Sequence, residues 1–243
     1  VTDVSDSMGA EDFKPKNRLF VAKKTIQDFI QKRQGDHVGL IVFGGTAFTY
    51  CPLTVDYGAL ESFVDELSIS MAGGGTAIGM AIATGVNRLK SSASKSKIMI
   101  LLTDGENTTG QIDPISAAEL GKKLGIKIYT IGVGKEGGAP IPYIHPKVGK
   151  TYYRNPDGSL FLTRIDEGLL KKIANITNGQ YFRATNTESL DRIYELIDQL
   201  EKTEKKLTQY REYNDIFGWF LSAALACICG ITVIQFCILR AVP

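Results

Sequence analysis

Histidine and cysteine are scarce in this chain, and their scarcity excludes several kinds of site. The 243 residues include two histidines, His37 and His145, whose neighbours do not form a zinc-type cluster. Three of the four cysteines fall in one apolar stretch near the C-terminus, which leaves Cys51 alone in the remainder of the chain. An intrachain disulfide therefore cannot hold the globular part together, and cysteine usage does not indicate a redox compartment.

An excess of charge is also missing. The chain has 28 basic and 26 acidic residues, for a net charge of +2, and no dense cluster of lysine and arginine interleaved with aromatic residues. This balance argues against a dedicated nucleic-acid-binding protein. The glycine-rich residues 73–79 lack the Gly-Lys-Ser/Thr ending of a nucleotide P-loop, so no nucleotide site is expected there.

One long apolar run is present, at residues 216–239. Its 24 residues contain no charged side chain. As a helix it would be about 36 Å long, enough to cross a hydrocarbon core of roughly 30 Å. Phe217 and Trp219 near one end and Arg240 beyond the other are typical of residues at a membrane interface. The run predicts a transmembrane helix, with a buried core helix as the alternative, and the charge-mixed residues 204–215 before it predict a stalk.

The basic residues around this run bear on its orientation. Four of them, between residues 202 and 211, precede the run, whereas Arg240 follows it. The charge rule by itself would therefore place the globular part in the cytoplasm. Because the chain opens with Val1 rather than methionine, we interpret it as a fragment whose missing spans would also influence orientation.

Apolar runs and amphipathic segments alternate through residues 1–203. Strands are expected at 1–2, 37–43, 47–54, 97–103, 126–133 and 180–183, and helices at 17–33, 57–67, 76–89, 114–124, 166–177 and 187–203. Nearly all-apolar strands alternating with amphipathic helices are typical of a parallel sheet covered on both faces. We therefore expect residues 1–203 to form an α/β domain with a doubly wound, mostly parallel sheet and helices on both faces.

Residues 135–165 interrupt this alternation. They are rich in glycine, proline and tyrosine, and Asn155-Pro156-Asp157-Gly158 is a strong turn signal. We expect a β-hairpin insertion in this region.

Oxygen-bearing side chains follow two of the predicted strands and open one of the predicted helices. In a doubly wound sheet these places meet at the carboxyl edge, where ligands bind. The set contains two carboxylates and three hydroxyls, without histidine or thiol, which suits a hard cation such as Mg²⁺, with Mn²⁺ or Ca²⁺ as alternatives. The five predicted metal ligands are Asp3, Ser5, Ser7, Thr76 and Asp104.

Catalytic interpretations have less support from the residues. A serine nucleophile would require a histidine base, and neither histidine falls at the predicted edge. Asp3 as a phosphoryl acceptor would lack a second carboxylate two positions on. We expect no enzyme, although a magnesium-dependent hydrolase and a purely structural scaffold remain open, and each motif alone is also compatible with a capping turn.

Two acidic side chains adjoin the predicted metal ligands. Asp6 lies inside the first motif, and Glu106 lies two residues after Asp104. Asp6 could point to solvent, which we expect, or it could offset the charge of the metal and lower the affinity for an acidic partner. Glu106 raises the same question.

These motifs resemble the von Willebrand factor A domain and its metal-ion-dependent adhesion site, from residue 1 to about residue 203. All five positions of the adhesion-site motif are present. The segments DFKPKNRLFVAKK and GGTAIGMAIATGVNRLK are more narrowly similar to the bacterial Bat (aerotolerance) branch. The resemblance implies that Ser5, Ser7 and Thr76 ligate the metal through their hydroxyls, and that Asp3 and Asp104 ligate it directly or through water.

The resemblance also implies a function and a location. An open sixth metal position would accept a carboxylate from an Asp or Glu of a protein partner, which is binding chemistry. Bat proteins carry membrane spans around the domain and are thought to work with each other and with MoxR-type AAA+ ATPases on envelope proteins. The resemblance therefore implies a metal-dependent protein-interaction module on the outer side of the bacterial inner membrane, in conflict with the charge rule.

Overall fold

The computed structural model describes residues 1–94 and 96–211, together with scattered positions between 220 and 235. Residues 1–197 form one compact unit and residues 198–243 form a second. The transmembrane helix predicted at 216–239 lies largely outside the described residues. Within the part of the chain that the structure describes, no helix combines the length and apolar character needed to cross a membrane.

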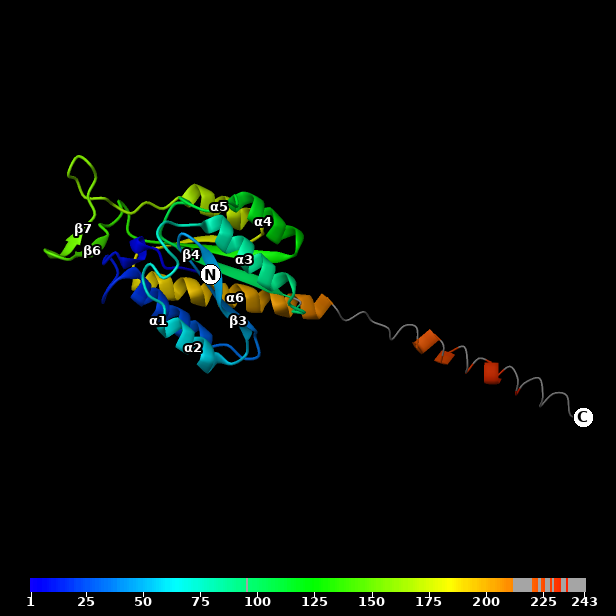
Figure 1. The fold of residues 1–243 in the computed structure, drawn as a ribbon. Coiled ribbons are helices and arrows are strands. Elements are labelled where there is room, and N and C mark those ends of the chain that lie inside the picture. The colour runs from blue at the N-terminus through cyan, green and yellow to red at the C-terminus, as the bar shows by residue number, and fades with distance from the viewer. Residues whose placement is uncertain are drawn as a thin grey trace, which may run out of the picture. The chain divides into compact units, whose positions relative to one another are not determined.

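A six-stranded sheet forms the centre of the first unit (Figure 1). Its strands run in the order β3-β2-β1-β4-β5-β8, and all neighbours are parallel except the antiparallel pair β2 and β3. The fold is therefore the mostly parallel α/β sheet that the sequence predicts. The strands are β1 (Thr2–Asp3), β2 (Val38–Phe43), β3 (Ala47–Thr54), β4 (Lys97–Thr103), β5 (Ile126–Val133) and β8 (Tyr181–Ala184).

Strand β1 is short and central. Thr2 pairs with Val42 of β2 on one side and with Leu102 of β4 on the other. The edge strand β3 is less regular, because its register against β2 shifts on both sides of Leu40 and its Pro52 is exposed.

Helices cover both faces of the sheet. In Figure 1, α3, α4 and α5 lie on one face, and α1, α2 and the first part of α6 lie on the other. Polar side chains cap several of them: Asn17 Oδ1 accepts from Phe20 N at 2.8 Å, and Asp113 Oδ2 accepts from Ser116 N at 2.8 Å. The helices are α1 (Arg18–Gln31), α2 (Tyr57–Asp65), α3 (Ile78–Lys90), α4 (Pro114–Lys123), α5 (Glu167–Ile176) and α6 (Thr187–Arg211).

The main core lies between the sheet and helices α3, α4 and α5. It is built from branched side chains on the strands that interlock with apolar side chains on the three helices. The buried residues at its centre include Leu101, Ile126 and Ile128 of the strands and Ile78, Ile82, Leu170 and Ile173 of the helices.

The chain forms a small second sheet after β5 and before α5 in the sequence. Strands β6 (Pro142–His145) and β7 (Gly149–Tyr152) pair antiparallel as a hairpin, within the segment 135–165. The hairpin projects away from the main sheet, at the left of Figure 1.

The helix boundaries differ from the sequence-based prediction by at most two residues, except at the end of α6. Helix α6 continues to Arg211, so its backbone runs through most of the predicted stalk. Helix α3 begins at Ile78 rather than at Thr76, because Ala77 N donates to Gly44 O at 2.7 Å and Thr76 O accepts from Thr108 N at 2.9 Å. Neighbouring loops thus hold Thr76 outside the helix.

Candidate metal centre

Three loops converge at the carboxyl edge of the central strands. The first follows β1 and contains a short 3-10 helix, Asp6–Gly9 (η1). The second precedes α3, and the third follows β4. Of the side chains predicted to bind metal, Asp3, Ser5, Thr76 and Asp104 are buried, and Ser7 is half-buried.

A continuous chain of hydrogen bonds joins four of the predicted residues. Asp3 Oδ1 accepts from Ser5 N at 2.9 Å, and the hydroxyls of Ser5 and Ser7 lie 3.0 Å apart. Ser7 Oγ donates to Asp104 Oδ1 at 2.6 Å. The first and third loops are therefore connected directly through the side chains that the motif predicts.

Thr76 approaches the same place from the second loop. A Cβ atom added to Gly105 would lie 3.2 Å from Thr76 Oγ1, so the hydroxyl sits against the residue that follows Asp104. Among the described residues, no hydrogen bond involves this hydroxyl. The structure thus brings all five predicted residues to one edge and leaves the Thr76 hydroxyl available to a ligand.

Glycines allow the second loop to lie against the loop that follows β2. Gly45 N donates to Gly73 O at 3.1 Å, and Thr46 N donates to Ala72 O at 3.0 Å. A Cβ on Gly45 would collide with the carbonyl oxygen of Gly74. The position of Thr76 therefore depends on backbone contact that a larger residue would prevent.

Arg18, which sequence reasoning missed, is the positive charge of the site. Its guanidinium is fully buried at the start of α1. Nη1 donates to Asp104 Oδ2 at 2.7 Å, and Nε and Nη2 donate to the two Asp12 oxygens at 2.7 and 2.6 Å. Nη2 also donates to Thr163 Oγ1 at 3.1 Å. The sequence indicated only that Arg18 would lie on the buried face of α1, because it shares that face with Ala22.

Thr103 is a second residue that sequence reasoning missed. Its hydroxyl donates to Asp3 Oδ2 at 2.6 Å and accepts from Gly105 N at 3.2 Å. As a result, both oxygens of Asp3 and both oxygens of Asp104 accept hydrogen bonds from the protein. The carboxylates are fixed in place by the chain itself.

Burial makes the two carboxylates costly to ionise. It raises the pKa of Asp3 to about 7, and the neighbouring Asp104 carboxylate adds to the increase. Burial also raises the pKa of Asp104, although the Arg18 guanidinium opposes that increase. Burial disfavours the charged form of Arg18, but the carboxylates of Asp12 and Asp104 outweigh it and raise the Arg18 pKa. A further positive charge would stabilise both carboxylates in their ionised form.

The expectation that Asp6 points to solvent is met only in part. Asp6 is half-buried, and its Oδ1 accepts a hydrogen bond from the hydroxyl of Ser70, a residue in the left-handed region with φ 64°. The side chain thereby holds the chain that leads into the second loop. Glu106, in contrast, is exposed.

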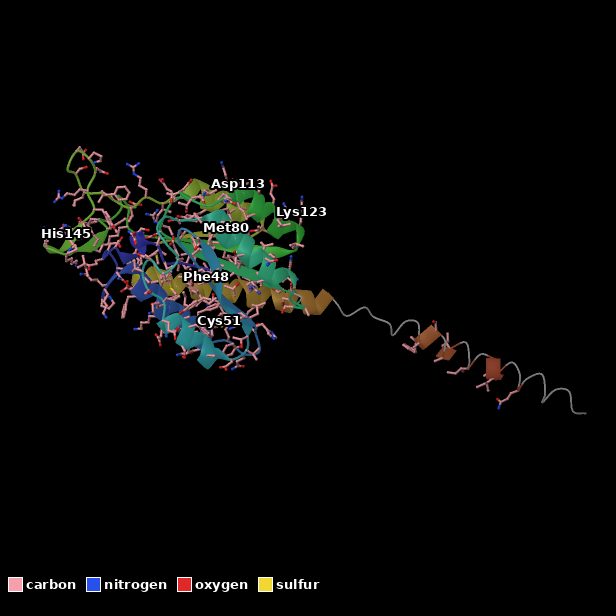
Figure 2. The ribbon with its side chains drawn as sticks, viewed as in Figure 1. Phe48, Cys51, Met80, Asp113, Lys123 and His145 are labelled. Carbon is pink, nitrogen blue, oxygen red and sulfur yellow. The ribbon has the colours of Figure 1, made fainter. Side chains whose placement is uncertain are left out.

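The donor set fits a hard divalent cation. Hydroxyl and carboxylate oxygens are the ligands that Mg²⁺, Mn²⁺ and Ca²⁺ prefer. In the part of the chain that the structure describes, no group of three or more His, Cys, Asp or Glu side chains could hold a metal ion, so a cation at this edge would depend on the hydroxyls. His145 lies on the projecting hairpin, and its Nδ1 accepts from Lys147 N at 3.2 Å rather than from any of the five residues (Figure 2).

The fold and the edge residues define an α/β domain with an oxygen-lined site between three loops. Residues 1–196 match the von Willebrand factor type A domain family. The chain belongs to this family, many of whose domains bind a divalent metal and mediate protein interactions.

Several bacterial proteins are similar to this chain in sequence or structure. An uncharacterized protein of Borreliella burgdorferi is 31% identical over 224 residues, which are 92% of this chain and 64% of that protein. BatB from Bacteroides thetaiotaomicron is 35% identical, with a TM-score of 0.69 over 82% of this chain and 96% of that chain. An aerotolerance-related membrane protein from Bacteroides fragilis is 34% identical, with a TM-score of 0.70 over 80% and 94%.

These similarities confirm the resemblance to the Bat branch of the family. The chain spans less than two thirds of the length of the curated relatives that it matches, 64% of the Borreliella burgdorferi protein and 61% of a Nocardia farcinica protein.

Proposed function

We propose that this chain is a metal-ion-dependent protein-interaction module. The observation that carries the proposal is the hydrogen-bonded network in which Asp3, Ser5, Ser7 and Asp104 meet at the carboxyl edge. The Thr76 hydroxyl, which lies beside Gly105, forms no hydrogen bond with a described residue. Carboxylates and hydroxyls from three loops converge there.

The residues of the site would have different roles. Ser5, Ser7 and Thr76 would hold a divalent cation through their hydroxyls, and Asp3 and Asp104 would supply negative charge. Because three of the five ligands are neutral hydroxyls, the site would not fully neutralise the charge of a bound divalent cation. The remaining positive charge would attract a carboxylate of a partner. Arg18 and Thr103 keep the two aspartates in position by hydrogen bonds that do not require a metal.

A hydrolytic use of the same residues has weaker support. No described histidine hydrogen-bonds to Ser5 or Ser7, so neither hydroxyl has a neighbouring base to activate it. A structural scaffold that never engages a partner is the remaining alternative, and the experiment below separates the three.

We further propose that the domain is anchored in the bacterial inner membrane. Residues 1–203 would be the domain, 204–215 the stalk and 216–239 the span, on the strength of the uncharged apolar run. The name of the Bacteroides fragilis relative, an aerotolerance-related membrane protein, supports membrane association. The resemblance to Bat proteins further suggests an extracytoplasmic domain that works with other Bat proteins and a MoxR-type AAA+ ATPase on envelope proteins. A reporter fused to the C-terminus tests the orientation, since activity on the cytoplasmic side is expected.

Metal titration tests the central proposal. The full chain in detergent, stripped with EDTA and dialysed, is titrated with Mg²⁺ and Mn²⁺ by calorimetry, alongside Asp104→Ala and the control Asp28→Ala. Asp28 is an exposed acidic residue of α1, so its loss should leave binding unchanged, whereas Asp104→Ala should abolish it. Equal binding by wild type and Asp104→Ala would contradict the proposed site.

Two further measurements distinguish the functions. Co-purification with the MoxR-type ATPase of the same organism is compared in Mg²⁺ and in EDTA, and metal-dependent retention that Asp104→Ala loses supports an interaction module. Hydrolysis of p-nitrophenyl phosphate that requires Mg²⁺ and is lost in the same variant would support the hydrolase instead. Metal binding with neither behaviour would leave the scaffold.

A further inference from the structure

Exposed apolar side chains gather on the insertion between β5 and α5. Among the described residues of the first unit, eleven large hydrophobic side chains are exposed, and six of them belong to residues 135–165. Ile144 and Val148, at 83% and 74%, are the most exposed of all. A concentration of this kind marks an interaction surface. The six are Ile144, Val148, Tyr153, Leu160, Phe161 and Leu162.

The insertion is also basic. It carries five basic and two acidic side chains, whereas the whole chain is nearly balanced at 28 and 26. Lys147, Arg154 and Arg164 are exposed, and none of them forms an ion pair with a described residue. Positive charge beside apolar area complements a partner that is both acidic and apolar.

Hydrogen bonds fix this surface next to the candidate metal centre. Ile144 pairs with Lys150 across the hairpin, so the two side chains share one face, and Lys150 Nζ reaches Glu11 Oε2 at 2.6 Å. At the base of the insertion, Thr163 Oγ1 accepts from Arg18 Nη2 at 3.1 Å and from Ala139 N at 3.1 Å. Arg18 in turn bonds Asp104.

We propose that the hairpin face around Ile144 and Val148 is a docking surface for a protein segment that combines acidic and apolar side chains. The inference rests on the proposed function, because a carboxylate of the same segment would reach the metal centre while its apolar side chains cover the hairpin. The hairpin therefore determines which acidic partner binds, a choice that the metal alone cannot make. Apolar contact and charge complementarity act together at this surface.

The test uses short random peptides displayed on phage, selected against the full chain in detergent with Mg²⁺. Enriched peptides should contain both acidic and large apolar residues. When synthesised, they should bind Ile144→Ser/Val148→Ser and Lys147→Glu/Arg164→Glu about tenfold more weakly than wild type, as loss of a central contact does. The control is Leu120→Ser/Leu124→Ser, which changes an exposed apolar residue of α4 and the exposed residue that follows this helix. Asp113 and Lys123, which mark the two ends of α4, lie away from the hairpin (Figure 2).

Other outcomes overturn the inference. Enrichment of basic or uncharged peptides, or unchanged binding by the hairpin variants, would do so. Hairpin-dependent flotation with phosphatidylglycerol vesicles, without peptide binding, would assign the surface to a membrane. Hairpin-dependent self-association in sedimentation experiments would assign it to a second copy of the chain.

The experiments can contradict the metal-dependent function and the docking surface independently of each other. Calorimetric Mg²⁺ binding is measured in every variant of the insertion and should be unchanged, since no side chain of residues 135–165 belongs to the predicted ligand set. Peptide binding that needs the hairpin but persists in EDTA would contradict the metal-dependent function and leave the docking surface intact. Binding that needs Mg²⁺ but tolerates every hairpin variant would contradict the docking surface alone.

Discussion

Arg18 and Asp104 form a buried ion pair, with 2.7 Å between Nη1 and Oδ2 and no solvent exposure of either side chain. The same guanidinium contacts Asp12 at 2.6 Å. Two carboxylates from different loops therefore depend on one internal cation.

Arg18→Met should destabilise the metal-free protein strongly. The substitution leaves the Asp104 carboxylate buried without a positive partner, and breaking a buried pair in this way typically costs about 3–5 kcal/mol. Urea denaturation in EDTA measures the change in the free energy of unfolding. Added Mg²⁺ should restore part of the loss, because a cation binding only the folded state stabilises it.

The exposed pair Lys32–Glu195 supplies the control for this substitution. Both side chains are more than half exposed, and surface pairs contribute about 0–1 kcal/mol, so Lys32→Met should change stability by no more than that. If Arg18→Met lowers the free energy of unfolding by no more than Lys32→Met does, the Arg18 guanidinium does not hold the loops together.

Thr163→Val should loosen the insertion. Valine fills similar space but cannot accept the hydrogen bonds from Arg18 and Ala139 N, and leaving such buried donors unsatisfied costs about 1–3 kcal/mol. Hydrogen exchange should accelerate at residues 139–165, whereas Thr163→Ser should retain the protection of wild type. Equal exchange in both variants would rule out an anchoring role for the hydroxyl.

Gly45→Ala should weaken metal binding through the backbone. The added Cβ meets the Gly74 carbonyl oxygen, so the second loop must shift and carry Thr76 with it. We expect a lower melting temperature and a weaker calorimetric affinity for Mg²⁺. Gly58→Ala in α2 is the matched control, since its Cβ meets nothing closer than 3.6 Å and the helix should gain about 0.5–1 kcal/mol. Unchanged Mg²⁺ affinity in Gly45→Ala would contradict the dependence on this close approach.

Asp12 should stabilise the protein in a pH-dependent manner. Burial acts to raise the pKa of Asp12, but the hydrogen bonds and charge of Arg18 outweigh it and hold the pKa below its ordinary value. The folded state therefore binds the proton less readily than the unfolded chain, whose Asp pKa is about 3.9. The stabilisation is present above that pH and is lost as the pH falls through the folded pKa.

Comparison of wild type with Asp12→Asn tests this sign. The difference in unfolding free energy, measured in EDTA, should be largest near neutral pH and should shrink as the pH falls below about 4. A difference that grows toward acid pH would contradict the assigned charge state.

The sheet and the convergence of the loops could be predicted because the signals are local. Nearly all-apolar strands such as 97–103 and 126–133 have the predicted bounds, and the parallel order then brings the residues after β1 and β4 together. Helix-capping residues such as Asp113 could also be predicted from the sequence. The choice of these side chains as metal ligands stays a prediction.

The partners of the site could not be predicted, because they come from distant segments. Arg18 lies 86 residues from Asp104 and 145 from Thr163, and its helical spacing gives no sign of either contact. The contact of Asp6 was missed for a similar reason, since the hydroxyl that donates to it lies 64 residues away in a turn with left-handed backbone. Contacts between residues so far apart in the sequence can be identified only from the three-dimensional positions of the loops.

The irregular edge strand β3 restricts how other chains can approach the sheet. Regular edge strands offer unpaired backbone groups that recruit further strands, whereas proline and shifted register discourage such recruitment. With Pro52 exposed and the register broken near Leu40, β3 is a poor template, and β8 at the opposite edge has only four residues. Many copies crowded on one surface should therefore stay separate rather than fuse edge to edge, which leaves the loops free for reversible recognition.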